Sequence, residues 1–364
     1  MALGLSRDTC LEVCGLSKHA FYYCSTGSKP GKTASQTSMQ WKDGSWLEVA
    51  NARVIEEMHQ INEQAGKMQG YHRMCAELQL QGFKINRKKV YRLMKEAKLL
   101  RKVVKPKGRK YVRYRIVLPS EPLTLLEMDI KQVWIAGQSR PAFILTILDV
   151  FTRSALYWQV GYRMTNEQVR AAWECLIEHV LQPLKRPDAH MHIEVRCDNG
   201  PQFVAKALQL FLCENFLQQT FTHPYTPQEN GHIESFHAIL GDSLEERYFE
   251  DLSDLENFLE GFYKRYNYER VHSGILYLPP VTFWHQWTLG HIECQVIDEP
   301  KRKARFSLKI PRWQIRKIQP QPAGNGSQRE VLSLDFLGLD APENPITTIK
   351  QQSDGAVLNA QPAV

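Results

Sequence analysis

The first third of the chain contains three stretches in which apolar residues recur at helical spacing. The first stretch places Val54, Met58 and Ile61 on one face. The second covers residues 71–80 and is ended by Gly82, and the third runs from Arg87 to about Lys98. In the third stretch the apolar residues share one face and the other faces are cationic, which suits insertion into the major groove of DNA. The pattern predicts an all-α helix-turn-helix DNA-binding region over residues 45–102, although an ordinary surface helix in a basic bundle would show the same pattern.

From about residue 119 the pattern changes to strands that alternate with helices. The predicted strands are 123–130, 142–150, 154–160, 192–197 and 218–221, and the predicted helices are 166–181, 203–215, 232–246 and 254–268. Three consecutive strands followed by a strand–helix–strand arrangement predict an α/β fold, a mixed sheet with helices on its faces. We assign residues 119–288 to this fold.

The segments outside these regions are short or polar. Residues 1–24 contain a helical signal, a turn and a natural N-cap at Ser17, and predict a short helix-turn-helix fragment. Residues 25–44 are rich in Gly, Ser and Thr and predict a linker. Residues 320–364 are rich in Gln, Pro, Gly, Ser and Asn and predict a tail without fixed structure, except around residues 332–339.

Composition narrows the class of protein. The chain has 364 residues, of which 43% are apolar, enough for two or three domains. No run approaches the roughly 18 apolar residues of a membrane-spanning helix, and nothing at the N-terminus indicates secretion. The eight scattered cysteines indicate reduced thiols rather than a disulfide framework. We therefore expect a soluble cytoplasmic protein with no membrane partner.

The net charge of +7 is unevenly distributed. Residues 84–115 contain 15 Lys and Arg but a single acid, and residues 301–317 contain eight and no acid. Such blocks are often solvated faces or localisation tags. The first block, however, includes tyrosines and lies beside the cationic helix, which favours double-stranded DNA as a partner. We predict a basic linker over residues 103–118 and a basic C-terminal region over residues 289–319.

The residues expected to contact DNA lie in the cationic helix, in the basic linker and in the Pro-rich loop before the helix at 232–246. In chain order they are Arg87, Lys88, Lys89, Arg92, Lys95, Lys107, Arg109, Lys110, Gln228 and Asn230.

Three carboxylates occupy positions that the predicted fold can bring together. Asp129 lies near the end of the first predicted strand, Asp198 directly follows the fourth, and Glu234 begins a helix. Clustered carboxylates repel one another unless a cation neutralises them, and such hard oxygen ligands suit Mg²⁺, with Mn²⁺ as a substitute. Two such ions about 4 Å apart can activate a nucleophile and stabilise the leaving oxygen in phosphoryl transfer. The three residues are therefore candidate metal ligands and catalytic residues.

The sequence context of these carboxylates is specific. Asp198 is followed by Asn-Gly, and a Thr-Pro-Gln loop leads to Glu234 at a helix start. Together with Asp129, this context resembles the catalytic core of the DDE transposases and retroviral integrases, which share a ribonuclease H-like fold. Over residues 5–285 the chain resembles the OrfB-type transposase of bacterial insertion sequences.

Two further motifs carry this resemblance. The helix-turn-helix motif matches at Gly70, Tyr71, Arg73, Leu78, Gly82, Asn86, Val90, Tyr91, Leu93 and Met94. The motif that closes the core matches at Asn267, Arg270, His272 and Pro279.

The resemblance implies an enzyme that cleaves DNA and transfers strands without a covalent protein intermediate. A metal-activated water would free a 3′-OH at the end of the element, and this hydroxyl would attack another phosphodiester bond. The resemblance also implies a homo-multimer on DNA, an OrfA product or an OrfA–OrfB fusion as a partner, and association with the bacterial nucleoid.

Two other functions have to be weighed against this one. A DNA-binding repressor whose core no longer cuts would not need all three carboxylates. A two-carboxylate hydrolase of polysaccharides would need neither the helix-turn-helix region nor the basic block.

The chain departs from the family at residue 241, which is often a lysine on the DNA-facing side of its helix and here is Gly241. We expect His237 or Gln228 to take part of the role of that lysine.

Several other residues could suggest a metal site. Asp149 is favoured as a hydrogen-bonded turn residue, and Cys197 is expected to point away from Asp198 into the core. A zinc site would use Cys10, Cys14, His19 and Cys24, but Cys14 fits the apolar face of a small helical unit instead.

Overall fold

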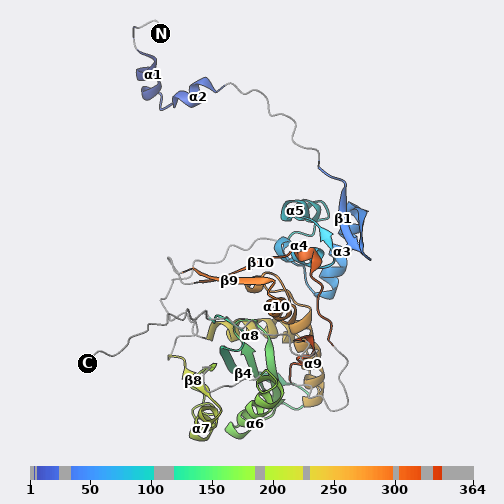
Figure 1. The fold of residues 1–364 in the computed structure, drawn as a ribbon, viewed down its shortest axis with the longest axis vertical. Coiled ribbons are helices and arrows are strands. Elements are labelled where there is room, and N and C mark those ends of the chain that lie inside the picture. Colours follow the sequence, from blue (N-terminus) through green and yellow to red (C-terminus); the bar gives the residue numbers. More distant parts are fainter. Residues whose placement is uncertain are drawn as a thin grey trace, which may run out of the picture.

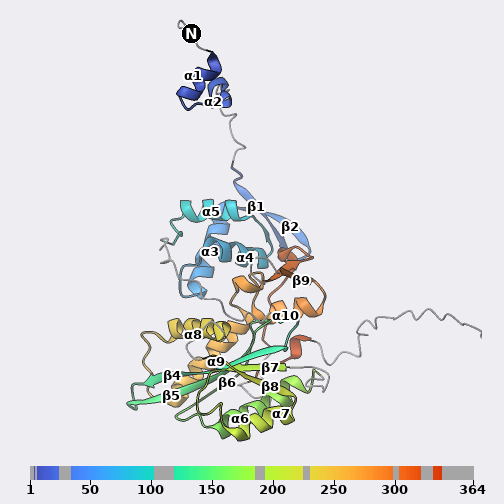
Figure 2. The ribbon, with the colours of Figure 1, turned by 90° about the vertical axis from the view of Figure 1, so that its left-hand side faces the viewer.

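The computed structural model describes residues 4, 6–23, 34–101, 119–184, 193–223, 230–297, 303–320 and 331–337. A largely helical region adjoins an α/β core, and C-terminal segments lie between the two (Figure 1, Figure 2). None of the helices in these residues has the length and the apolar character needed to cross a membrane.

Two short helices, α1 (Arg7–Val13) and α2 (Lys18–Tyr22), form the predicted N-terminal fragment. Ser17 caps α2, because its side chain accepts a hydrogen bond from the backbone N–H of Ala20. Within this pair of helices only Leu11 is buried. Cys14, which we expected on the apolar face, is exposed.

Three longer helices pack around one apolar core and confirm the predicted helix-turn-helix. They are α3 (Asn51–Gln64), α4 (Tyr71–Leu80) and α5 (Arg87–Glu96). Their apolar faces supply fully buried side chains such as Met58 and Leu93. The N-cap of α5 is Asn86, whose side chain accepts a hydrogen bond from the backbone N–H of Lys89.

A small antiparallel sheet packs beside these helices. The prediction that residues 45–102 are all-α is therefore wrong. Strand β1 (Thr37–Lys42) pairs with β2 (Ser45–Ala50) and with β3 (Phe83–Lys84). Strand β1 lies inside the segment predicted as a linker over residues 25–44, which is therefore wrong for these six residues.

The turn between β1 and β2 explains why this hairpin forms. Asp43 and Gly44 both have positive φ, as a two-residue hairpin turn requires. The helix-turn-helix turn then lies against β1. A Cβ on Gly82 would lie only 2.4 Å from the carbonyl oxygen of Trp41, so only glycine fits this position.

The core contains a five-stranded mixed sheet in the order β6-β5-β4-β7-β8. Strands β4 (Leu125–Ile135), β5 (Arg140–Asp149) and β6 (Ala155–Gly161) form an antiparallel meander. Strands β7 (Ile193–Cys197) and β8 (Leu217–Phe221) run parallel to β4. This topology confirms the predicted α/β fold.

Helices cover both faces of the sheet (Figure 2). On one face lie α6 (Asn166–Leu176), its π-helical continuation η1 (Ile177–Leu181) and α7 (Lys206–Glu214). On the other face lie α8 (Gly231–Leu244) and α9 (Leu252–Tyr268). Each face therefore has its own apolar core, and α8 lies on the side of the sheet that faces the helix-turn-helix region.

The segments after α9 connect the two regions. They are η3 (Ser273–Ile275), α10 (Pro280–Thr288), the antiparallel pair β9 (Ile292–Ile297) and β10 (Lys303–Leu308), and η4 (Arg312–Gln314). One apolar cluster includes Leu80 of α4, Phe151 of the core, Phe283 of α10 and Ile315. The C-terminal segments thus share a core with both regions.

Part of the predicted tail is ordered. Val331 bridges to Tyr157, and the backbone N–H of Leu332 donates a hydrogen bond to the carbonyl of Leu156. Leu332 and Leu334 are only 6% and 8% exposed, within the core of the α6 face, and η5 (Asp335–Leu337) follows. The prediction of an unstructured tail is therefore wrong for residues 331–337, and the exception made around residues 332–339 is confirmed for them.

Replacing Leu332 or Leu334 with alanine is expected to lower the free energy of unfolding by about 2 to 5 kcal/mol, since each substitution leaves a cavity in a packed core. Chemical denaturation of the full chain measures this change. Leu210→Ala is the matched control, because this leucine is 63% exposed and its loss should cost no more than about 0.5 kcal/mol. Equal effects at the buried and exposed positions would contradict the docking of residues 331–337.

Candidate active site

The register between β4 and β7 places two of the three predicted carboxylates side by side. Glu127 pairs with Arg196 across the parallel strands. The same register, carried two residues further, puts Asp129 opposite Asp198, which directly follows β7. Asp129 lies in the middle of β4 and not near its end, because the strand is longer than the pattern predicted.

The alternation of side chains along the strands points both carboxylates toward α8. Their neighbours Met128 and Cys197 are buried in the core of the opposite face, so Asp129 and Asp198 face the other way. This confirms the expected orientation of Cys197. Burial raises the pKa of its thiol to about 12, which keeps the thiol protonated.

Asp198 is held by its own turn. Its Oδ1 accepts a hydrogen bond from the backbone N–H of Gly200 at 2.9 Å, and Asn199 donates to the carbonyl of Thr222. A Cβ on residue 200 would lie 2.5 Å from the side-chain amide of Gln202 and 3.0 Å from Asp198 Oδ1. The Asp-Asn-Gly sequence is therefore what lets the chain turn tightly at the end of β7.

Helix α8 supplies the third carboxylate. Glu234 and His237 are three residues apart and so share a face of this helix. Nδ1 of His237 lies 3.2 Å from Oδ2 of Asp129. Burial and the charge of Asp129 raise the pKa of Glu234, and His237 partly offsets this effect. Asp129 and Glu234 are thus close enough to repel each other, which a bound cation would relieve.

The donor set fits a divalent cation in its chemistry. Carboxylate oxygens from β4, from the end of β7 and from α8 are the hard ligands that Mg²⁺ and Mn²⁺ prefer. Among the described residues, no three His, Cys, Asp or Glu side chains come close enough together to hold a metal ion. Oδ1 of Asp198 accepts from the N–H of Gly200, and Oδ1 of Asp129 accepts from the N–H of Ile130.

The five cations of α5 that we expected to contact DNA fall into two groups. Lys89 donates to the side-chain oxygen of Ser35 and Arg92 donates to its carbonyl, both at 2.9 Å. Burial and the nearby Arg92 lower the pKa of Lys89. These two cations therefore bind the segment before β1. The exposed cations are Arg87, Lys88 and Lys95.

The other expected DNA contacts lie off the helix. Asn230, an expected DNA contact, immediately precedes α8 and is only 5% exposed, which leaves little of its side chain accessible to DNA. Four expected contacts lie outside the described residues, namely Lys107, Arg109, Lys110 and Gln228.

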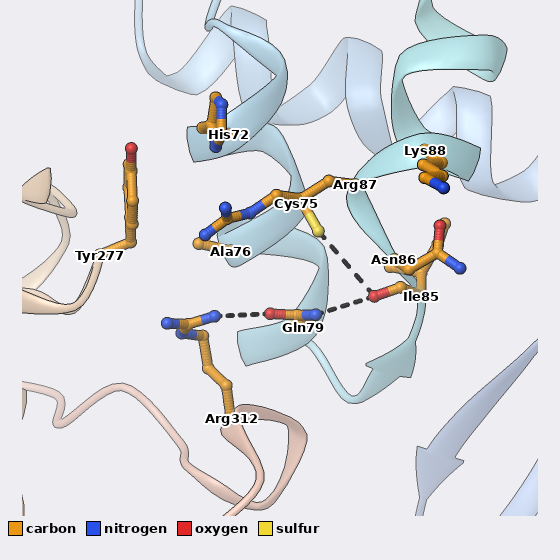
Figure 3. Close-up of a pocket in the computed structure, with 10 residues that line it drawn as sticks. All are labelled: His72, Cys75, Ala76, Gln79, Ile85, Asn86, Arg87, Lys88, Tyr277 and Arg312. Carbon is orange, nitrogen blue, oxygen red and sulfur yellow. Dashed lines mark hydrogen bonds between the residues drawn. The ribbon is translucent and has the colours of Figure 1, made fainter. Parts of the chain in front are cut away.

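A pocket of about 580 Å³ adjoins the start of α5. Figure 3 shows Tyr277 and Arg312 on one side of it and α4 with the side chain of Arg87 on the other. Its lining includes Arg87, Lys88 and Arg312 and no acidic residue. The pocket is therefore cationic and lies where α5 meets the C-terminal segments.

Comparison with known families decides which class of protein has this architecture. An integrase core domain matches residues 119–227, a second integrase core domain model matches residues 216–280, and an HTH-like domain matches residues 47–107. A 31.7 kDa protein of insertion element IS407 from Burkholderia multivorans is 29% identical over 238 residues, covering 65% of this chain and 80% of that protein. The chain therefore contains an integrase core domain and an HTH-like domain, and it is similar to proteins of bacterial insertion elements.

Other relatives of this chain also come from insertion elements. A 39.2 kDa protein of insertion element IS476 from Xanthomonas euvesicatoria is 29% identical over 284 residues, covering 77% of this chain and 72% of that protein. The transposase for insertion sequence element IS904 from Lactococcus lactis is 25% identical over 146 residues, covering 39% of this chain and 54% of that protein.

Glu127 is a site residue that the sequence reasoning missed. Its Oε2 accepts hydrogen bonds from the backbone N–H groups of His232 and Ile233, at 3.1 and 2.7 Å. It therefore binds the first turn of α8 to β4 and positions Glu234, which follows directly. Burial raises the pKa of Glu127 to about 7, although these two hydrogen bonds and the nearby arginines lower it. The available signal was its position, two residues before Asp129 and so on the same face of the strand.

Asp149 and Asn267 serve the fold. Asp149 is fully buried and accepts hydrogen bonds from the backbone of Leu123 and Thr152, which confirms it as a turn residue. Asn267 of α9 exchanges two hydrogen bonds of 2.9 Å with the backbone of Ala155 at the start of β6. Both residues fix elements that surround the carboxylates.

The basic C-terminal region binds the protein itself at several points. Arg312 donates hydrogen bonds to the Gln79 side chain of α4, at 2.7 Å, and to the Leu276 carbonyl of the core, at 2.6 Å. Lys317 lies 2.7 Å from the carboxylate of Glu77 and also donates to the carbonyl of Glu269. These cations therefore fasten the helix-turn-helix region to the core.

Glu127→Ala is expected to destabilise the protein by about 1 to 3 kcal/mol, because it leaves two buried N–H groups of α8 without a partner. It should also slow DNA cleavage, since Glu234 loses its support. Glu127→Gln keeps an acceptor oxygen and should retain most of both properties. Thermal unfolding and cleavage rates of the two variants test this role, and a fully active Glu127→Ala variant would contradict it.

Proposed function

We propose that this transposase cuts DNA at the ends of its own insertion element and joins the freed ends to new DNA, with Asp129, Asp198 and Glu234 as the catalytic carboxylates. The observation that carries the proposal is the β4–β7 register, whose continuation two residues beyond the pair Glu127 and Arg196 would bring Asp129 opposite Asp198. The contact between α8 and β4 at Asp129 and His237 supports the assignment of Glu234.

We further propose Mg²⁺ as the cofactor, with Mn²⁺ as a substitute and two ions in each site. Such ions would supply the positive charge that activates the attacking hydroxyl group and stabilises the leaving oxygen. Asp129, Asp198 and Glu234 would hold them. Joint binding requires the Asp198 side chain to turn from the N–H of Gly200 toward Asp129, whereas Glu127 already holds the first turn of α8, and with it Glu234, against β4.

Recognition of the DNA ends is assigned to the helix-turn-helix region. The exposed cations of α5 suit contacts with phosphates and base edges in the major groove. The cationic pocket beside them suits a backbone phosphate, because its lining has no acid to repel one. Lys107, Arg109, Lys110 and Gln228 remain proposed DNA contacts on the basis of the sequence.

The resemblance to OrfB-type transposases also supports two proposals about assembly. The chain would act as a homo-multimer on DNA, and an OrfA product or an OrfA–OrfB fusion would complete recognition of the ends. All three carboxylates are present, so no observation favours the inactive repressor.

The variants Asp129→Asn, Asp198→Asn and Glu234→Gln are each expected to abolish metal-dependent nicking while DNA affinity changes little. The assay uses a labelled duplex from the end of the element, with Mg²⁺, Mn²⁺ or EDTA. The losses should be several orders of magnitude in rate, because ligand removal disables the metal site as a unit.

Glu214→Gln serves as the matched control, since this exposed residue of α7 lies on the opposite face of the sheet. It should cut at the native rate. An active Asp198→Asn variant would overturn the assignment of the three carboxylates.

A further inference from the structure

Lys131 lies on the same face of β4 as Asp129, two residues further along the strand. Its ammonium lies against the backbone of α8 at Gly241. A Cβ on residue 241 would be 3.5 Å from Nζ of Lys131 and 3.8 Å from its Cε. The glycine therefore leaves open the space over which the lysine extends.

Two neighbouring contacts fix this arrangement. Four residues before Gly241 on α8 and two residues before Lys131 on β4, Nδ1 of His237 lies 3.2 Å from Oδ2 of Asp129. One residue beyond Gly241, the carboxylate of Asp242 lies 3.4 Å from Nζ of Lys67, in the connection between α3 and α4. Along α8, the contact with Lys131 at Gly241 thus lies between the contact of His237 with Asp129 and the contact of Asp242 with Lys67.

Lys131 is unpaired among the residues that the structure describes. It forms no hydrogen bond or ion pair within the described part of the chain, and its side chain is half-buried. The positive group that acts on Glu234 is His237 and not Lys131. An ammonium with three donors that lies beside Gly241 is available to an anion from outside the chain.

Of the two residues expected to take part of the role of a lysine at position 241, Gln228 lies outside the described residues. The His237 side chain is only 12% exposed and faces Asp129. The cation that lies over α8 at Gly241 is instead Lys131 of the neighbouring strand β4.

We propose that Lys131 binds a backbone phosphate of the DNA strand that enters the active site. The absence of a side chain at Gly241 leaves the space over which the Lys131 side chain extends. The inference rests on the proposed function, since it assumes that DNA reaches these carboxylates. It adds a positioning residue on β4 between the recognition helix and the proposed point of cleavage.

The test measures DNA affinity of the full chain against salt concentration, together with kcat and KM for cleavage. For Lys131→Ala, the slope of log affinity against log salt should fall by about 0.9, the value for one lost phosphate contact. KM should rise several-fold while kcat changes little. Lys131→Arg keeps the charge and should keep the slope, and so should the control Lys206→Ala on the opposite face of the sheet.

Substitutions at Gly241 probe the same contact from the helix. Gly241→Ala should be tolerated, because a Cβ at 3.5 Å is in ordinary contact with the ammonium. Gly241→Glu should reproduce the Lys131→Ala slope by pairing with the ammonium, and should add little to Lys131→Ala. The double variant Lys131→Ala/Gly241→Lys should restore the slope.

An unchanged slope for Lys131→Ala overturns the proposal, as does additive loss for Lys131→Ala with Gly241→Glu. The slope is a binding measurement and does not depend on cleavage. An inactive native chain would therefore contradict the proposed function separately.

Discussion

The parallel pairing of β4 with β7 is the constraint on which the proposed active site depends. It joins a strand of the antiparallel meander to one that the chain reaches only after crossing the sheet through α6. Its register sets Asp129 opposite Asp198, and the alternation of side chains turns both toward α8. Two hydrogen bonds from Glu127 then bind the start of α8 to the same strand. A shift of one residue in this register would turn Asp198 into the core of the opposite face.

A second constraint joins the DNA-binding region to this core. Arg312 and Lys317 reach side chains of α4 and carbonyl groups of the core, and an apolar cluster runs from Leu80 to Ile315. The C-terminal segments therefore connect the helix-turn-helix region to the core that carries the carboxylates. A basic block that could have been read as a nonspecific DNA-binding surface is used largely for internal contacts.

Local patterns predicted most of the elements because burial on one face of a helix or strand leaves a clear period. The helices at Tyr71–Leu80 and Arg87–Glu96 and the strand at Ile193–Cys197 are examples. The β1–β2 hairpin was missed because its strands are largely polar and exposed, although Asp43-Gly44 is a hairpin signal. The docking of Leu332 and Leu334 was only partly foreseen, because it depends on contacts distant in sequence.

In the candidate site too, local features could be predicted from the sequence and packing contacts could not. The three carboxylates could be selected from sequence context, because strand ends and helix starts are local features. The sequence could not show whether a cation is exposed or binds its own chain. Lys89 and Arg92 resemble Lys95 in the sequence, yet both bind Ser35. Glu127 and Lys131 acquire their roles only from the packing of α8 against β4.

The central claim is that the three carboxylates form one metal centre. Crystals of the full chain grown with Mn²⁺ test it directly through the anomalous scattering of the metal. We expect anomalous density within coordination distance of Asp129, Asp198 and Glu234, with the Asp198 side chain turned away from Gly200. Bound Mn²⁺ that none of these residues contacts would contradict it.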